Sequence, residues 1–397
     1  MKTNTVFYLI AMTVFIAGCS FDKQSKDGLP YIDVRQNYPE KEIFLTDIAN
    51  VSYLYLNSDD DDYLYQGSIS YITDNTVVVV DNSSGSILFF SKDGTPKSRF
   101  NRKGQGPEEY YNSPAVIYDE ITDEVFVHGF RVIQVYSSIG EYKRTITLPQ
   151  GMVVNEMISF DDHSFFFYDF SVRMRAMSEA KLSNKEYIGP PYHLYYRISK
   201  TTGEVIDSIK LPATQTFLGI NLNGKQQFAF PLSHLTKCPE GVLLSSHGTD
   251  TIFLYGYDKS LTPILYQTPS ITALNPLEFL DNYVDRGQYQ FIKSIVVRRG
   301  DESPGIFPAK YYMRNKKTGE TVRPKLLLPD YKGKEFVINN ADSGAVGEYE
   351  NGYYFELDLY ELKKADRENK VSGKLKELVD TLNEDEDNNV FVLVEFK

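Results

Sequence analysis

Residues 102–110, with the sequence RKGQGPEEY, combine the residue types most suggestive of chemistry in this chain. Two basic residues, two glycines and two glutamates occur between short apolar runs of the kind that form strands. Glycine-rich loops can cradle phosphates, but a nucleotide-binding P-loop places a lysine and a serine or threonine after its second glycine. Proline follows Gly106 instead. We therefore interpret the stretch as a connection between strands, with ligand binding through its charged side chains as the alternative.

Three histidines provide a second set of candidate functional residues. His128 and His247 each precede a glycine, in the similar segments FVHGF and SSHGT, and His193 lies just before the corresponding strand of another unit. Neutral imidazoles are good ligands for divalent metals. The alternative hypothesis is accordingly one divalent metal ion serving a lyase or hydrolase. The chain has no HxxxH or HExxH spacing, so ordinary loop histidines are the default interpretation.

Other reactive residue types indicate structure rather than catalysis. The four carboxylates at 59–62 lack the alternating ligands, the glycine and the closing glutamate of a calcium loop, so a solvated turn is expected. Cys238 stands between a lysine and a proline and is interpreted as a small filler residue. No Gly-x-Ser-x-Gly elbow and no Cys-x-x-Cys pair occurs.

Composition restricts the class of protein. The chain has 397 residues, a formal net charge of −12, 30 tyrosines and 25 phenylalanines, but no tryptophan. A nucleic-acid-binding protein needs a basic face, so this charge argues against a nucleic-acid partner. Aromatic residues favour strands, which points to an all-β protein.

The N-terminus predicts export and lipid anchoring. The segment MKTNTVFYLIAMTVFIAGCS has a basic residue, an apolar stretch and small residues before Cys19, which is typical of a signal peptide. IAGC resembles the bacterial lipobox, and this resemblance implies cleavage before Cys19 and lipidation of its sulfur. We therefore predict a signal peptide at 1–18, a lipidated tether at 19–40 and a membrane contact through the anchor only.

The remainder of the chain is a repeat. Residues 76–100, 124–148 and 241–266 each contain a β-branched run, a polar turn, a second run ending in an aromatic residue, a tight turn and a third run. Two weaker copies occupy 163–211 and 290–328, and a short extra strand precedes each copy. Four strands per repeated unit are typical of a β-propeller, which we assign to residues 41–397.

Both ends of the chain are expected to build the sixth blade. Its strands are predicted in 42–57, in KEFVINN, in 352–362 and at the C-terminal NNVFVLVEFK. Closure by both termini hides sheet edges that would otherwise promote aggregation. Helical spacing of Val371, Leu375, Leu378, Val379 and Leu382 predicts one amphipathic helix packed on this blade.

The lipobox, the segment RKGQGPEEY and the ending EDNNVFVLVEFK together resemble the six-bladed β-propeller lipoproteins of Bacteroidota, which are related to NHL-like and TolB-like propellers. This resemblance covers nearly the whole chain. It implies a propeller in the cell envelope, lipid-anchored to the outer membrane, and implies no particular activity. Asn389 is followed by Val390, whereas members of this family commonly have Asn-Pro there.

These patterns favour a non-catalytic binding or scaffold protein whose ligand, an envelope protein or a glycan, occupies the mouth of the central funnel. The loops expected at that mouth are 82–86, 102–110, 128–131 and 246–250. The candidate ligand-binding residues are Arg102, Lys103, Glu108, Tyr110, Phe130 and Arg131. In the alternative hypothesis, His128, His193 and His247 hold the metal; in the preferred one, no cofactor is needed.

Overall fold

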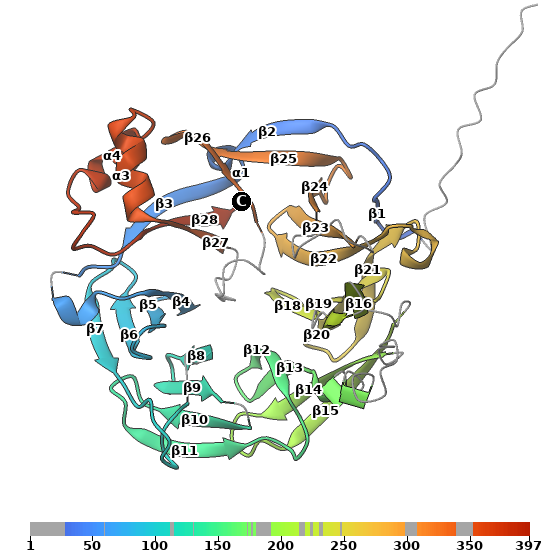
Figure 1. Ribbon diagram of the computed structural model, residues 1–397, viewed down its shortest axis with the longest axis horizontal. Helices are drawn as coiled ribbons and strands as arrows, with labels where there is room; N and C mark the ends of the chain where they lie inside the picture. Colours follow the sequence, from blue (N-terminus) through green and yellow to red (C-terminus); the bar gives the residue numbers. More distant parts are fainter. Residues whose placement is uncertain are drawn as a thin grey trace, which may run out of the picture.

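Short apolar strands joined by tight turns form a ring of β-sheets around a common centre (Figure 1). The computed structural model describes residues 28–58, 60–111, 115–129, 131–172, 174–175, 178–179, 192–213, 219–222, 225–229, 233–246, 248–297, 308–338 and 352–397. Within these ranges, six sheets contain three or more strands, and we call them blades 1 to 6 in ring order. The expected six-bladed β-propeller is confirmed.

Blades 1 to 3 are four-stranded antiparallel sheets whose strands run outward from the centre in sequence order. Blade 1 comprises β4 (Gly67–Ile72), β5 (Thr76–Asp81), β6 (Ile87–Ser91) and β7 (Pro96–Phe100). Blade 2 comprises β8 (Ala115–Asp119), β9 (Glu124–His128), β10 (Val132–Tyr136) and β11 (Tyr142–Thr147). Blade 3 comprises β12 (Val154–Asp161), β13 (Ser164–Asp169), β14 (Tyr192–Ser199) and β15 (Val205–Pro212).

Blades 4 and 5 each gain an outer strand from the N-terminal part of the chain. Blade 4 comprises β18 (Ser233–Cys238), β19 (Gly241–Ser246), β20 (Thr251–Gly256), β21 (Leu261–Thr268) and the parallel β1 (Tyr31–Asp33). Blade 5 comprises β22 (Leu277–Arg286), β23 (Tyr289–Val297), β24 (Ala309–Asn315), β25 (Thr321–Leu328), β26 (Tyr331–Phe336) and the parallel β2 (Glu40–Phe44). Sheet structure therefore begins at Tyr31, inside the range 19–40 that the sequence predicts to be the tether.

Blade 6 joins the two ends of the described chain. Its strands are β27 (Gly352–Leu357), β28 (Val390–Phe396) and β3 (Ala49–Tyr55), and β28 pairs antiparallel with β3 from Val390–Tyr55 to Phe396–Ala49. The predicted closure by both termini is confirmed. Three details were wrong: 42–57 divides between β2 and β3, KEFVINN contributes to β26 of blade 5, and the second half of 352–362 is helical.

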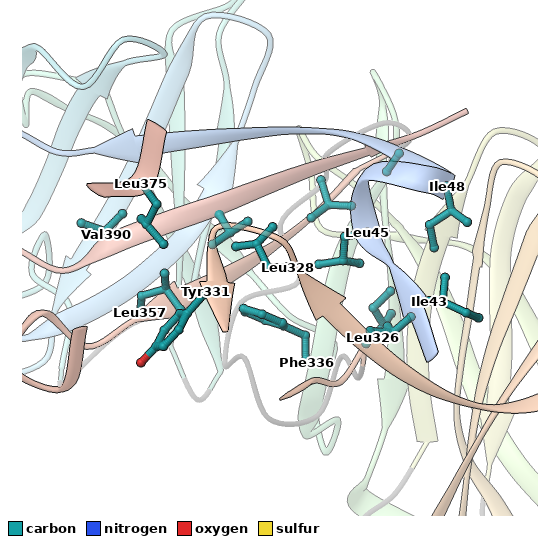
Figure 2. Close-up of a cluster of buried hydrophobic side chains, with 14 of the residues drawn as sticks. Ile43, Leu45, Ile48, Leu326, Leu328, Tyr331, Phe336, Leu357, Leu375 and Val390 are labelled. Carbon is teal, nitrogen blue, oxygen red and sulfur yellow. The ribbon is translucent and has the colours of Figure 1, made fainter. Parts of the chain in front are cut away.

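Two helices, rather than the single one expected, cover the junction of blades 5 and 6. They are α3 (Leu359–Arg367), whose first turn is capped by the side chain of Asp358, and α4 (Gly373–Val379). Asn369, which has a left-handed φ of 55°, lies between them. Leu375 packs with Leu357, Val390 and Tyr331 in one buried cluster, so the helices join the core between these two blades (Figure 2).

The remaining described elements are short. They are α1 (Leu45–Ile48), the 3₁₀ turns η2 (Asp61–Tyr63) and η3 (Ile271–Ala273), and a separate hairpin of β16 (Gly219–Leu222) and β17 (Lys225–Ala229). Among the residues described, no helix has the length and apolar character needed to cross a bilayer.

Glycines fix the contact between neighbouring blades. Gly94, Gly140 and Gly203 occupy the turn between the third and fourth strands of blades 1, 2 and 3, each with a left-handed φ of 75–89°. A Cβ atom on Gly94 would lie 1.9 Å from the carbonyl oxygen of Tyr55, at the end of the outer strand of the preceding blade. Gly140 and Gly203 approach Phe100 and Thr147 in the same way. The repeated turn glycine therefore sets the close packing of blade on blade.

Candidate functional site

A cavity of about 710 Å³ occupies the centre of the ring, and we call it the central cavity. Blades 1 to 5 contribute to its wall, mainly through the ends of their innermost strands and the turns that lead to the second strands. Its lining residues are Tyr71, Ile72, Thr73, Asp74, Asn75, Ile117, Tyr118, Asp119, Glu120, Ile121, Ser159, Asp162, Lys200, Lys237, Cys238, Pro239, Tyr257 and Arg286. Convergence of several blades on one concave space makes this the candidate site.

The carboxylates of the central cavity all come from blades 1 to 3, whereas two of its three cations come from blades 4 and 5. Blades 1 to 3 supply the carboxylates of Asp74, Asp119, Glu120 and Asp162. The cations come from the turn after β14 and from the innermost strands of blades 4 and 5; they are Lys200, Lys237 and Arg286. A ligand bound here would meet hydrogen-bond acceptors on one wall and cationic donors on the other.

Glu120 shows how the acidic wall is held in place. Its carboxylate accepts hydrogen bonds from Thr76 Oγ1 at 2.6 Å, Thr73 Oγ1 at 2.8 Å and Asn75 Nδ2 at 3.2 Å. Burial raises the pKa of Glu120, but the bonds from Thr76, Thr73 and Asn75 outweigh it, so the pKa falls below its ordinary value. This carboxylate is therefore ionised at neutral pH and ties blade 2 to blade 1.

Arg286 is the buried cation of the opposite wall, with only 6% of its surface exposed. Its Nε donates to the carbonyl of Gly352 at 3.1 Å, and its Nη1 donates to the carbonyls of Lys237 at 2.9 Å and Asp285 at 2.8 Å. These acceptors belong to the innermost strands of blades 6, 4 and 5. Arg286 thus joins three blades at the centre, and no carboxylate of a described residue forms an ion pair with it.

Lys200 and Cys238 line the same cavity, and both are buried, with 6% of the surface of each exposed. Lys200 Nζ donates to Ser159 Oγ at 2.8 Å and lies over the rings of Phe126 and Phe165. Desolvation by burial raises the pKa of the Cys238 thiol to about 11. Because the thiolate is the nucleophilic form, a thiol protonated at neutral pH is unreactive, which agrees with the filler interpretation.

The stretch 102–110 packs as a tight connection between blades 1 and 2. The hydroxyl of Tyr110 donates to the carbonyl of Gly85 at 2.7 Å and accepts from the backbone N–H of Arg102 at 3.1 Å. The carbonyls of Pro107 and Glu108 accept from Gln134 and Tyr136 of blade 2. Tyr110 is only 2% exposed, so it is a packing residue rather than a contact offered at a mouth.

The two glycines of this connection lie close to the carboxylate of Glu109. Neither Gly104 nor Gly106 has a left-handed φ. A Cβ atom on Gly104 would lie 1.9 Å from Glu109 Oε2, the oxygen that accepts the backbone N–H of Gly106 at 2.7 Å. The carboxylate of Glu109 folds back onto the loop, so a side chain at position 104 would have to displace it.

The remaining loop residues do not line the central cavity. Arg102 and Lys103 are exposed, and Arg102 Nε donates to the carbonyl of Gly140 at 3.0 Å, in the turn between β10 and β11. Arg131 is exposed in the turn between β9 and β10. Phe130 lies outside the described residues. In antiparallel blades, successive turns lie at opposite ends, so these loops are at the other end of the blades from the turns that line the central cavity.

The structure places two of the three histidines in strands. His128 is the last residue of β9, and its buried Nε2 forms no hydrogen bond with any residue that the structure describes. His193 lies in β14, the third strand from the centre, where it is 1% exposed and faces the ring of Tyr168. His247 lies outside the described residues. Within the described part of the chain, no three histidine, cysteine or carboxylate side chains are grouped to hold a metal ion.

Sequence reasoning missed the residues that do line the centre. A signal was present, since the first turn of successive units carries charged or polar residues in TDN, DEITD and DDH. Arg286 was harder to identify from the sequence, because its segment DRGQ is typical of an ordinary hairpin turn. Identification of either wall required knowledge of which turns face the centre.

Comparisons with known proteins agree with this fold. A family model described as a 6-bladed beta-propeller matches residues 21–215. Among solved structures, the chain resembles a Bacteroides fragilis protein to which export is attributed, with a TM-score of 0.56 and 16% identity over 93% of this chain and 99% of that one. The protein is therefore a six-bladed β-propeller. At this level of identity, the structural likeness concerns the fold alone.

Other similar structures are more distant. The WD40 domain of Neurospora crassa Pan2 has a TM-score of 0.36 and 10% identity, over 69% of this chain and 72% of that one. A luciferin-regenerating enzyme has a TM-score of 0.39 and 9% identity, over 88% of this chain and 98% of that one. No curated protein gives a significant sequence match.

Proposed function

We propose that this protein is an exported propeller, lipid-anchored to the outer membrane, that binds a polar ligand or an envelope protein in the central cavity without transforming it. The observation that carries this proposal is the cavity of about 710 Å³ with acidic and cationic walls supplied by five blades. Such a space can orient a polar ligand through contacts with several rigid strands.

The chemistry of the lining residues favours recognition over catalysis. Glu120 is saturated by three hydrogen bonds, and Arg286 is fixed by three backbone carbonyls. General acid–base catalysis works best when the pKa of the group lies near the working pH. The lowered pKa of Glu120 and the raised pKa of Cys238 both move away from neutrality.

The proposed location rests on the N-terminal sequence. The apolar stretch and IAGC support export and lipidation at Cys19, and the export attributed to the similar Bacteroides fragilis protein is consistent with this. Replacement Cys19→Ala should leave an unprocessed precursor or release the protein from the membrane fraction. Processing together with retained acyl labelling in this variant would contradict the anchor.

Binding can be tested with a soluble form that lacks the N-terminal 27 residues. We expect capture of a component from arrays of acidic and neutral glycans or from envelope extracts. Variants Asp162→Lys and Asp74→Lys, which reverse charges on the acidic wall, should weaken the interaction at least tenfold. Glu377→Lys, on the exposed side of α4, serves as the matched control. A ligand whose affinity is the same for all variants would contradict the central cavity as its site.

A further inference from the structure

We propose that Arg286 anchors the carboxylate of a hydroxylated acid, of the acidic-sugar class, in the central cavity. This inference rests on the proposed function and deepens it by naming the chemistry of the ligand. Three observations support it: the free donor of Arg286, the lack of an ion pair between Arg286 and any described carboxylate, and the acceptors on the facing wall.

One nitrogen of the Arg286 guanidinium, Nη2, is available to a ligand. Nε and Nη1 are bound by carbonyls of Gly352, Lys237 and Asp285, whereas Nη2 has no hydrogen bond to any described residue. Nη2 is also not among the buried atoms without a partner, although Arg286 as a whole is only 6% exposed. Because Arg286 lines the central cavity, we infer that Nη2 is reached from that space.

A purely structural use of this arginine leaves its charge unexplained. Backbone carbonyls hold the side chain between three blades, but they do not neutralise a cation that remains charged at all accessible pH values. A buried, unpaired charge is costly, and it is stabilised when a counter-ion arrives. The carboxylate of Asp285 attracts Arg286 without forming a hydrogen bond or ion pair with it and is itself paired with Lys316, while Lys237 adds positive potential to the same wall. A ligand carboxylate supplies the missing charge through charge-assisted hydrogen bonds.

The acidic wall restricts the class of anion. Asp74 and Asp162 are exposed lining residues whose carboxylates make no hydrogen bond or ion pair with a described residue. Such carboxylates accept hydrogen bonds from hydroxyl groups and repel a second negative charge. A singly charged ligand with several hydroxyls satisfies both walls, whereas a polyphosphate or multiply sulfated chain does not. A uronic acid is the simplest compound with these properties.

The position of Arg286 at the end of a strand favours precise placement of its guanidinium. Arg286 ends β22, and the next residue, Gly287, has a left-handed φ of 54° and lies against the backbone at Lys397, because a Cβ there would be 2.6 Å from its carbonyl oxygen. The arginine is thus mounted on a strand end wedged against the closing blade. A site on rigid elements loses little entropy when a ligand binds.

The first test is calorimetry with glucuronate and glucose as probes, on the soluble form and its variants. We expect glucuronate to bind at least tenfold more tightly than glucose, and Arg286→Gln to abolish this preference. Arg286→Lys keeps the charge but loses the planar fork, and it should retain part of the preference. Arg99→Gln, which removes an exposed arginine paired with Asp62, is the matched control and should change nothing. Equal affinity for both sugars in the unaltered protein would overturn the proposal.

The second test does not depend on the folding of any variant. Crystals of the unaltered protein soaked in glucuronate should show its carboxylate within hydrogen-bond distance of Nη2. A sugar bound with its carboxylate elsewhere, or a cavity left unoccupied, would overturn the assignment to Arg286. If an array ligand is sensitive to Asp162→Lys but not to Arg286→Gln, the binding function stands and this inference fails. If no ligand is sensitive to either variant, both fail.

Discussion

Two connections of this propeller carry an arginine followed closely by glycine and glutamine, and they differ in almost every physical respect. In the stretch 102–110, Arg102 is exposed and donates to the carbonyl of Gly140 in an outer turn. At the end of β22, Arg286 is buried and donates to the innermost strands of the neighbouring blades. The first connection holds two blades together, and the second brings a charge to the central cavity.

The difference teaches that the place of a turn in the blade decides what its residues can do. Residues 102–110 have the composition of a binding loop. Several of their backbone groups, and the hydroxyl of Tyr110, instead form hydrogen bonds within the loop and to blades 1 and 2. The turn at Arg286 has an ordinary composition, but it ends an innermost strand, where blades converge. Four predictions test this contrast, from the largest expected effect to the smallest.

Removal of β28 should have the largest effect. This strand is the middle one of blade 6, its residues Val390, Val392 and Val394 are fully buried, and its end supports Gly287 beside Arg286. A chain truncated before Val390 should lose cooperative unfolding and aggregate, because the edges of β27 and β3 become exposed. Thermal unfolding and light scattering measure this. A soluble truncation that still unfolds cooperatively would show that closure is dispensable.

Tyr110 should matter for stability and not for ligand binding. Replacement Tyr110→Ala removes a buried ring and should lower the free energy of unfolding by about 3–5 kcal/mol. Tyr110→Phe retains the ring and loses only the bonds to Gly85 and Arg102, so a loss of about 1 kcal/mol is expected. Denaturant unfolding gives both values. Altered sugar affinity in the folded phenylalanine variant would break the contrast between the two connections.

His128 has a buried ring nitrogen that can be compared with the buried guanidinium of Arg286. Its Nε2 has no hydrogen-bond partner among the described residues, and desolvation by burial lowers the pKa of the ring to about 4. Since the unfolded histidine has a pKa near 6.5, only the unfolded state gains a proton as the pH falls from 7 to 5. The folded state should lose about 2 kcal/mol over this interval.

The measurement is the difference in unfolding free energy between the unaltered protein and His128→Gln at each pH. His163→Gln, at an exposed position, is the control. A difference that does not vary between pH 7 and pH 5 would mean that the folded ring takes up a proton as readily as the unfolded one.

Arg102 should have the smallest effect. Its side chain is exposed and its one described hydrogen bond reaches a carbonyl, so Arg102→Ala should change stability by less than about 0.5 kcal/mol. Glucuronate affinity should stay the same. A tenfold loss of affinity in this variant would return the binding site to the loops first expected from the sequence, at the other end of the blades.

The fold was largely predictable because it is encoded locally. Each blade repeats a pattern of strand, turn and glycine that can be read over some tens of residues, and the β28–β3 closure followed from the need to cover edges. The division of 42–57 into β2 and β3 was not predictable. Alternation of apolar and polar residues does not show that the strand of Ile43 pairs with β25 and the strand of Leu54 with β28. Helix α3 was not predicted, because the sequence YFELDLYEL is compatible with both a strand and a helix.

The candidate site was less predictable because it depends on convergence. Arg286, Glu120 and Asp162 are far apart in the sequence and meet only when the ring is closed. Nothing local distinguishes the carboxylate of Glu120, which faces the centre, from that of Glu109, which folds back onto its own loop. For this reason charge and glycine content point to residues 102–110 and not to the turns that line the central cavity.

The strands β1, β2 and β3 have a consequence for the order in which the molecule can assemble. They precede blade 1 in the sequence, yet they pair with β21, β25 and β28. A ribosome delivers the chain from its N-terminus, so these strands must wait without partners until most of the polypeptide has emerged. Productive folding is therefore expected only after synthesis is nearly complete, which would keep the chain unfolded long enough to pass through a narrow export channel.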